Sequence, residues 1–255
     1  MRELTSFNIN TIKIMTHLLA HDAVTDEAIE TLRLLELDYY SLLDKNKILE
    51  EKINIDNKTN LLKYSDDYLT IILKTASRIL DRPVLRDAYN VAYIRFDIDD
   101  FSIINNKYGH DKGDIVLIDF ATILKENSRP TDYTIRYGGE EFDVMLPATD
   151  IKGASVYLNK IFNEIDKISY NFDTSPIKFG VSAGVSLLCV SYANLKRIDA
   201  GQMRDAYKTL QKEADDALYD AKHAGKNQYK VYDKDVDYKR IREAYAASNK
   251  GHTPV

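Results

Sequence analysis

The strongest constraint on the fold is a pair of adjacent glycines, Gly138-Gly139, set between two short apolar runs. Tyr133–Tyr137 precede the pair and Phe142–Leu146 follow it, and both runs are rich in residues that favour strands. A glycine pair between two such runs is a strong signal for a β-hairpin. The sequence therefore predicts a two-stranded hairpin, and the two glutamates after the glycines give it an acidic tip.

A second acidic motif, Asp97-Ile98-Asp99-Asp100, follows the apolar run Val91–Phe96, which we interpret as a strand. Carboxylates at a strand end and at a neighbouring turn can converge on one point. Hard oxygen ligands suit Mg²⁺, which keeps one or two carboxylates and takes substrate phosphates as further ligands. Such an ion can polarise an α-phosphate and lower the pKa of an attacking hydroxyl. Either motif alone could be a solvated turn, but the two together favour a phosphate-handling site.

The remaining pattern predicts a mixed α/β domain over residues 56–235. Helices are expected at 66–80, 103–107, 114–126, 154–168 and 206–223, and further strands at 178–188 and 229–232. Gly109 should stop the short second helix, and Gly225 should follow the last one. Residues 236–255 are expected to be a polar, frayed tail.

Residues 1–55 contain no Pro or Gly and are expected to be entirely helical. Thr25 or Asp26 can cap the start of a long helix. Apolar residues and one Asn recur in it at spacings of four and three: Ala28, Leu32, Leu35, Tyr39, Leu42, Asn46, Leu49 and Ile53. This pattern fits a two-stranded coiled coil, and it equally fits an amphipathic helix packed in its own small bundle.

Composition excludes several classes of protein. The net charge of −5 and the pI of about 5.6 argue against binding of a nucleic-acid polymer, which usually needs a basic face. No apolar run reaches membrane-spanning length, and Met1–Asn10 lacks the features of a signal peptide. A single cysteine, Cys189, excludes an internal disulfide framework, and no G-x-x-x-x-G-K-[ST] loop is present. A cytoplasmic protein without membrane contacts is the simplest interpretation.

Three segments together resemble the signatures of the GGDEF family. Arg136-Tyr-Gly-Gly-Glu-Glu-Phe142 is similar to the central signature, in its GGEEF form. Upstream, Asp97-Ile-Asp-Asp-Phe-Ser-Ile-Ile-Asn-Asn-Lys-Tyr-Gly-His-Asp-Lys-Gly-Asp114 resembles D-x-D-x-F-K-x-x-N-D-x-x-G-H-x-x-G-D. Downstream, Ala214-Asp-Asp-Ala-Leu-Tyr-Asp-Ala-Lys-His-Ala-Gly-Lys-Asn227 resembles A-D-x-A-L-Y-x-A-K-x-x-G-R-N. The segments keep the order and separations of the family over residues 56–235.

The resemblance implies a diguanylate cyclase, which joins two GTP molecules into cyclic di-GMP and releases two pyrophosphates. It implies an α/β (α+β), nucleotidyl-cyclase-like domain with a central, mainly antiparallel sheet flanked by helices, preceded here by the all-helical segment. The reaction needs two domains that face each other with one GTP each, so a homodimer is implied. The implied cofactor is Mg²⁺, with Mn²⁺ as an alternative.

The resemblance also implies roles for single residues. Asp97, Glu140 and the carbonyl of Ile98 would bind the metal, Glu140 would also accept the 3′-hydroxyl proton, and Glu141 would support the site. The implied substrate-binding residues are Phe101, Asn105, His110, Asp114, Gly138, Gly139, Lys222 and Lys226. Of these, Asn105 and Asp114 would read guanine. A carboxylate accepts from both N1–H and N2–H₂ of guanine, whereas adenine has an acceptor at N1. Without the family, Asn105 could simply cap a helix and His110 could be a loop residue.

Arg129 and Asp132 match the R-x-x-D inhibitory site of the family just before the hairpin. Arg129 can form bidentate hydrogen bonds with guanine or phosphate, and Asp132 can accept hydrogen bonds from guanine. Cyclic di-GMP bound there would act as a product inhibitor, because it would restrain the domains from meeting. A surface salt bridge in a loop is the simpler explanation of the same residues.

The sequence departs from the family pattern at several positions. Ser102 and Asn106 stand where Lys and Asp are usual, and Lys226 replaces Arg. The opening D-x-L-T-G-L-x-N-R-R appears only as Asp56-Asn-Lys-Thr-Asn-Leu-Leu-Lys-Tyr-Ser65. These changes favour a slow or tightly controlled enzyme. The alternatives are a degenerate domain that senses cyclic di-GMP, a cyclase with a mixed adenine–guanine product, and an adaptor whose function lies in residues 1–55.

Overall fold

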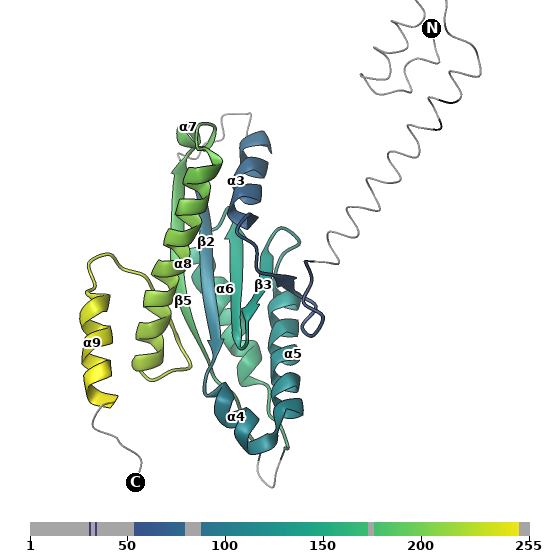
Figure 1. The fold of residues 1–255 in the computed structure, drawn as a ribbon, viewed down its shortest axis with the longest axis vertical. Coiled ribbons are helices and arrows are strands. Elements are labelled where there is room, and N and C mark those ends of the chain that lie inside the picture. Colours follow the sequence, from purple (N-terminus) through teal and green to yellow (C-terminus); the bar gives the residue numbers. More distant parts are fainter. Residues whose placement is uncertain (1–30, 32–33, 35–53, 80–87, 173–175, 250–255) are drawn as a thin grey trace, which may run out of the picture. The chain divides into compact units, whose positions relative to one another are not determined.

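The computed structural model describes Thr31, Leu34 and residues 54–79, 88–172 and 176–249 (Figure 1). The chain divides into two compact units, Met1–Asn54 and Ile55–Val255. The predicted heptad seam and its N-cap at Thr25 or Asp26 lie outside the described residues. Among the helices that are described, none is long and apolar enough to cross a membrane.

A six-stranded sheet with the order β1-β3-β4-β2-β5-β6 forms the centre of the second unit. Its strands are β1 (Leu62–Lys63), β2 (Ala88–Ile98), β3 (Tyr133–Gly138), β4 (Glu141–Pro147), β5 (Val181–Ser191) and β6 (Tyr229–Val231). The β2–β4, β2–β5 and β3–β4 pairs are antiparallel, while the two edge pairs, β1–β3 and β5–β6, are parallel. The predicted hairpin and the predicted central, mainly antiparallel sheet are both confirmed.

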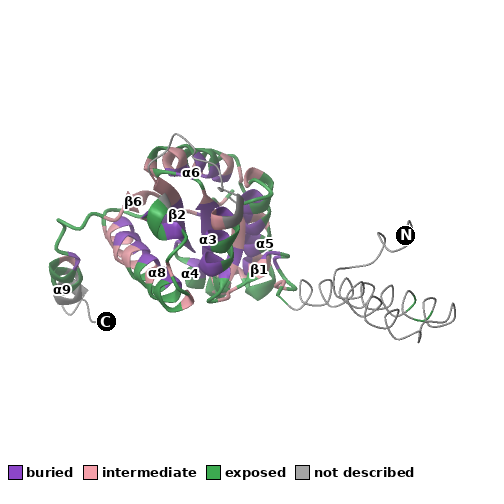
Figure 2. Cartoon of the chain, turned by 90° about the horizontal axis from the view of Figure 1, so that it is seen from above, coloured by how far each residue is buried: buried purple, intermediate pink, exposed green. Residues whose placement is uncertain are grey.

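Helices cover both faces of this sheet (Figures 1 and 2). The helices of this unit are α3 (Tyr68–Ile79), α4 (Phe101–Tyr108), α5 (His110–Asn127), α6 (Ile151–Asp166), α7 (Tyr192–Leu195), α8 (Ala200–His223) and α9 (Tyr238–Asn249), of which α9 packs on α8 rather than on the sheet. One apolar cluster joins the sheet to α4, α5 and α6, and a second joins the opposite face to α3 and α8. The observed architecture is therefore a sheet flanked by helices, as predicted.

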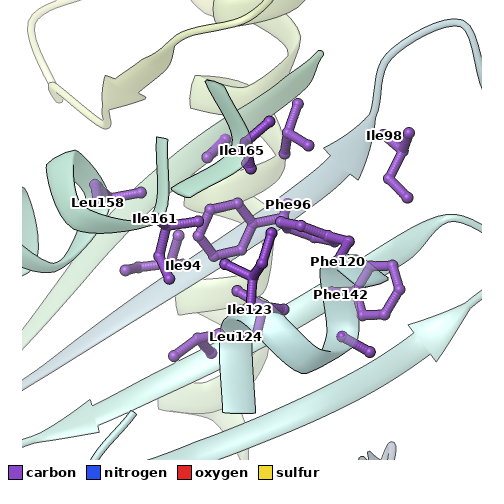
Figure 3. Close-up of a cluster of buried hydrophobic side chains, with 14 of the residues drawn as sticks. Ile94, Phe96, Ile98, Phe120, Ile123, Leu124, Phe142, Leu158, Ile161 and Ile165 are labelled. Carbon is purple, nitrogen blue, oxygen red and sulfur yellow. The ribbon is translucent and has the colours of Figure 1, made fainter. Parts of the chain in front are cut away.

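The long strand β2 supplies both apolar clusters, because successive side chains of a strand point to opposite faces. Ile94 and Phe96 belong to the first cluster, and Tyr93 belongs to the second. In the first cluster Phe120 of α5 makes edge-on contacts with Phe96 and Phe142, at centroid distances of 5.6 and 5.0 Å (Figure 3). The strands that carry the two acidic motifs are thus held against one helix.

Several boundaries differ from the predicted ones. Helix α5 begins at His110 rather than at residue 114, because Gly109, with φ 88°, turns the chain and lets a new helix start at once. Helix α8 begins six residues early at Ala200, where Asp199 and Gln202 form a capping box. Strand β5 lies three residues later than predicted, and β1 and α7 were not predicted.

The C-terminal tail is helical rather than frayed from Tyr238 to Asn249, so that expectation is wrong for these residues. Arg242 of α9 donates to Asp216 of α8 at 2.7 Å, and its guanidinium lies over the ring of Tyr219, 4.6 Å from the centroid. The ring of Tyr238 stacks on Tyr232 with centroids 5.2 Å apart. These contacts fasten α9 to the domain, which no local sequence pattern indicates.

Candidate active site

The two acidic motifs meet at one end of the sheet. Asp97, the last acidic residue of β2, lies in register with Glu141 at the start of β4. The backbone N–H of Ile98 donates to the carbonyl of Glu140 at 3.3 Å. The strand end and the hairpin tip are therefore in direct contact, as their sequences predicted.

Asp97 is buried, with 7% of its surface exposed, whereas Glu140 and Glu141 are only partly buried. Burial raises the pKa of its carboxyl, and the nearby Glu140 and Asp99 act in the same direction. The ammonium of Lys222 on α8 opposes this shift from 2.8 Å away. One lysine thus stabilises a cluster of carboxylates that would otherwise repel each other.

The oxygen atoms at this point suit a hard divalent cation. Asp97 and Glu140 offer carboxylates, and Ile98 adds a backbone carbonyl beside them. In the described part of the chain no three acidic, His or Cys side chains form a ready-made metal cage. Mg²⁺ does not need one, because it binds through one or two carboxylates and completes its shell with water and phosphate oxygens. The residues present therefore fit such an ion.

The hairpin tip has open space around its two glycines, and hydrogen bonds from Arg136 fix its backbone. A Cβ added at Gly138 or Gly139 would meet no atom within 4 Å, and Gly139 has φ 54°, which favours glycine. Arg136 donates to the Gly139 carbonyl at 3.0 Å and to Asp56 Oδ1 at 3.0 Å. The tip thus leaves room for phosphates while Arg136 ties it to the Asp56 turn. No individual role was predicted for Arg136 or Asp56 from the sequence.

The predicted base-binding residues gather where α4 meets α5. A Cβ on Gly113 would lie only 1.9 Å from Asn105 Oδ1, so the glycine allows the Asn105 amide to lie against α5. Asp114 is the next residue along that helix, and the ring of Phe101, 7% exposed, also lies against Gly113. Asn105 therefore lies against the residue that precedes Asp114, whereas His110 is exposed at the start of α5. Gly113 had no assigned role, although its place before Asp114 in the motif was a usable signal.

The other two acids of the motif Asp97–Asp100 stabilise the surrounding fold. Asp99 is buried and accepts from Ser182 Oγ at 2.7 Å and from the backbone N–H of Asn227 at 2.9 Å. Asp100, which has φ 55°, pairs with Lys226 Nζ at 2.6 Å. Lys226, predicted to bind substrate, therefore lies on Asp100 and joins the turn after α8 to the start of α4.

A buried charged network lies directly behind the hairpin. Arg95 donates to Asp143 at 2.8 and 3.0 Å, to Asp215 at 2.8 Å and to the Tyr93 hydroxyl at 2.8 Å. Its guanidinium also lies 4.0 Å from the ring centroid of Tyr137 in the signature. This network was not predicted from the sequence, although one charged residue inside each of two apolar strands was a signal for it.

The same network bears on Glu141. Partial burial raises the pKa of the Glu141 carboxyl, and the positive charge of Arg95 opposes that rise. Arg95 therefore favours the ionised form of Glu141 while it hydrogen-bonds Asp143.

The predicted inhibitory residues line a separate pocket of about 310 Å³ beside α6. The backbone N–H of Arg129 donates to Asp132 Oδ2 at 2.8 Å, and Asp132 N–H donates back to the Arg129 carbonyl at 3.0 Å. Burial raises the pKa of the Asp132 carboxyl, and its Oδ1 atom is buried without a hydrogen-bond partner. Tyr157 and Lys160 of α6 also line the pocket. This pocket offers an acceptor and two cationic side chains to a polar ligand.

Comparisons with known proteins identify the class. The family described as "Diguanylate cyclase, GGDEF domain" matches residues 53–228. Diguanylate cyclase A of Treponema denticola is 34% identical over 71% of this chain and 45% of its own length. Response regulator PleD of Caulobacter vibrioides is 37% identical over 54% of this chain and 28% of its own length.

Solved structures agree in fold. The coiled coil and GGDEF domain of DgcB from Caulobacter crescentus, solved in complex with c-di-GMP, has a TM-score of 0.59 at 21% identity, over 79% of this chain and 97% of that one. The chain belongs to the GGDEF family, which confirms the resemblance seen in its three motifs. It spans less than half the length of the two curated relatives named above.

Proposed function

We propose that this protein is a diguanylate cyclase that condenses two GTP molecules into cyclic di-GMP and releases two pyrophosphates. The observation that carries the proposal is the contact between the end of β2 and the hairpin tip, which brings Asp97 and Glu140 together beside Lys222. The family supports it, since the family model covers both segments and a relative named as a diguanylate cyclase is 34% identical over 71% of this chain.

Each residue has a chemical task in this proposal. Asn105 and Asp114 bind the donor edge of guanine, and Lys222 neutralises phosphate charge at the carboxylate cluster. Glu140 accepts the proton of the 3′-hydroxyl, and the 3′-oxygen then attacks the α-phosphate of the GTP held by a facing copy. The new P–O bond replaces the bond to pyrophosphate, and a second transfer in the opposite direction closes the ring. Mg²⁺ held by Asp97, Glu140 and the Ile98 carbonyl would polarise the α-phosphate.

The proposal includes a dimer, because no single domain holds both reacting nucleotides. We assign residues 1–55 to regulation and dimerisation, 56–235 to the cyclase domain and 236–255 to a C-terminal appendage. Ser102, exposed on α4 where the family has Lys, predicts a slow enzyme. Loss of one charge-stabilising contact raises a barrier by about 2.7–4 kcal/mol if oxyanion-hole donors are a guide.

The first test is mass-resolved product analysis of the pure dimer with GTP and Mg²⁺, after bound nucleotide has been stripped. The wild-type protein should form cyclic di-GMP. Glu140→Gln should lower the rate by roughly 10²-fold or more, the usual effect of losing a general base. The matched control is Glu164→Gln on α6, which should leave the rate unchanged, because the carboxylate of Glu164 pairs with the exposed Lys167 at 2.8 Å. A dimer that forms no product would overturn the cyclase proposal and favour a cyclic di-GMP sensor.

Product inhibition is a separate part of the proposal, and the pocket around Arg129 and Asp132 supports it. Arg129→Ala should raise the inhibition constant of cyclic di-GMP by roughly tenfold or more, because a hydrogen bond to a charged group contributes about 1.5–3 kcal/mol. Initial rates at several product concentrations measure it, with the exposed Arg197→Ala as the control. If cyclic di-GMP inhibits Arg129→Ala and wild type equally, this pocket is not the inhibitory site.

A further inference from the structure

Lys58 lies directly on the carboxylate that the proposed function assigns to guanine. Its ammonium is 2.5 Å from Asp114 Oδ1, and the two side chains keep 42% and 38% of their surface exposed. Lys58 occupies the third position of the family's opening pattern D-x-L-T, where leucine is usual. A cation thus replaces an apolar side chain beside the base-reading carboxylate.

The turn that presents Lys58 is held on both sides. Asp56 Oδ1 accepts from the Thr59 N–H at 2.9 Å and from the Thr59 hydroxyl at 2.7 Å, and Arg136 of the hairpin donates to the same oxygen at 3.0 Å. On the other side, Lys125 of α5 donates to the Asn60 carbonyl at 3.2 Å. The turn therefore bridges the hairpin and α5, and Lys58 starts from a fixed backbone.

A carboxylate bound to one lysine can still bind a base. Ionised Asp has two oxygens with about four acceptor sites, and Lys58 contacts one oxygen. Guanine presents its O6 acceptor next to N1–H. If the carboxylate of Asp114 accepts from N1–H, the ammonium of Lys58 on that carboxylate therefore lies close to O6. Adenine carries an amino donor at that position, which an ammonium cannot approach favourably.

We propose that Lys58 is a base-specificity residue, which stays on Asp114 and donates a hydrogen bond to O6 of guanine. The inference rests on the proposed binding of GTP, and it adds a contact that the leucine of the family pattern cannot make. Asp114 and Lys58 together then read a donor–acceptor pair along one edge of the base, so a purine with the reversed pattern meets two mismatches.

Calorimetric titration of the full-length dimer in Mg²⁺ can test the O6 contact without turnover. The two probes are 3′-deoxy-GTP, which lacks the attacking hydroxyl, and its 6-thio analogue, which keeps N1–H and N2–H₂ but has a weaker acceptor at position 6. Wild type should bind the oxygen compound roughly tenfold more tightly, the factor expected for one hydrogen bond to a charged group. Lys58→Leu should bring the ratio of the two affinities close to one.

Two further variants make the result specific. Lys58→Arg should restore most of the preference, while Lys112→Leu, two residues before Asp114 on the same helix, should retain it although it removes the same charge. If Lys58→Leu keeps the wild-type ratio, or binds both probes more tightly because Lys58 only competes for Asp114, the inference is overturned and GTP binding stands. If wild type binds neither probe, the proposed function fails together with the inference.

Discussion

Two ion pairs flank the acidic motifs, and they differ chiefly in their exposure to solvent. Arg95 and Asp143 face each other on adjacent strands, with 4% and 0% of their side-chain surfaces exposed. Lys58 and Asp114 join a turn to a helix, and about 40% of each side chain is exposed. The first pair has lost its water on folding, whereas the second can exchange water or a partner for a ligand.

This difference in exposure suits the Arg95–Asp143 pair to stabilising the fold and the Lys58–Asp114 pair to binding a ligand. A buried pair is expensive to break, because removing one member leaves the other charge without solvent or partner. An exposed pair contributes little to stability, so its members can change partners at small cost. The network of Arg95 joins β2 to β4 and α8, while in the proposed function the pair at Asp114 lies where guanine binds.

The largest effect is expected from Arg95→Met, which leaves the carboxylate of Asp143 in the core without its cation. The free energy of unfolding should fall by about 3–5 kcal/mol, measured by urea denaturation with circular dichroism. Lys58→Leu is the matched control for the exposed pair and should change stability by less than about 1 kcal/mol. The double variant Arg95→Met/Asp143→Leu should recover most of the loss, because two apolar side chains need no partner. If both single variants cost the same, exposure does not distinguish the two pairs.

A smaller effect is expected from the turn that carries Lys58. Partial burial alone would raise the pKa of Asp56, but hydrogen bonds from Thr59 and Arg136 outweigh it and lower the pKa to about 2 from 3.8. A depressed pKa stabilises the folded state above the unfolded value, and that stability is lost as pH falls toward the folded value. Asp56→Asn should therefore cost roughly 2 kcal/mol at pH 7.

The pH dependence of this variant provides its own control. The difference between wild type and Asp56→Asn should shrink between about pH 4 and pH 2, because the wild-type carboxylate is protonated there. Melting temperatures of both proteins across that window measure it. A constant difference down to pH 2 would show that Asp56 stabilises the turn by something other than its charge.

Much of the fold was predictable from local patterns. The hairpin around Gly138-Gly139, the buried strand before Asp97 and the helix before Gly225 all occur where alternation and turn residues predicted them. Helix starts were less predictable, since the capping residue Asp199 lies seven residues before the predicted start of α8. Helix α9 was missed, because it depends on contacts with α8 and Tyr232 rather than on a strong apolar face of its own.

The sequence by itself determined the family, the order of the elements and the acidic motifs at the ends of β2 and the hairpin, because these depend on residue types at short, regular spacings. Only the tertiary structure decided which charges meet. Lys58 and Asp114 are 56 positions apart, and Arg95 and Asp143 are 48 apart. Periodicity describes which face of an element a residue lies on, and only the packing of elements against each other sets its long-range partner.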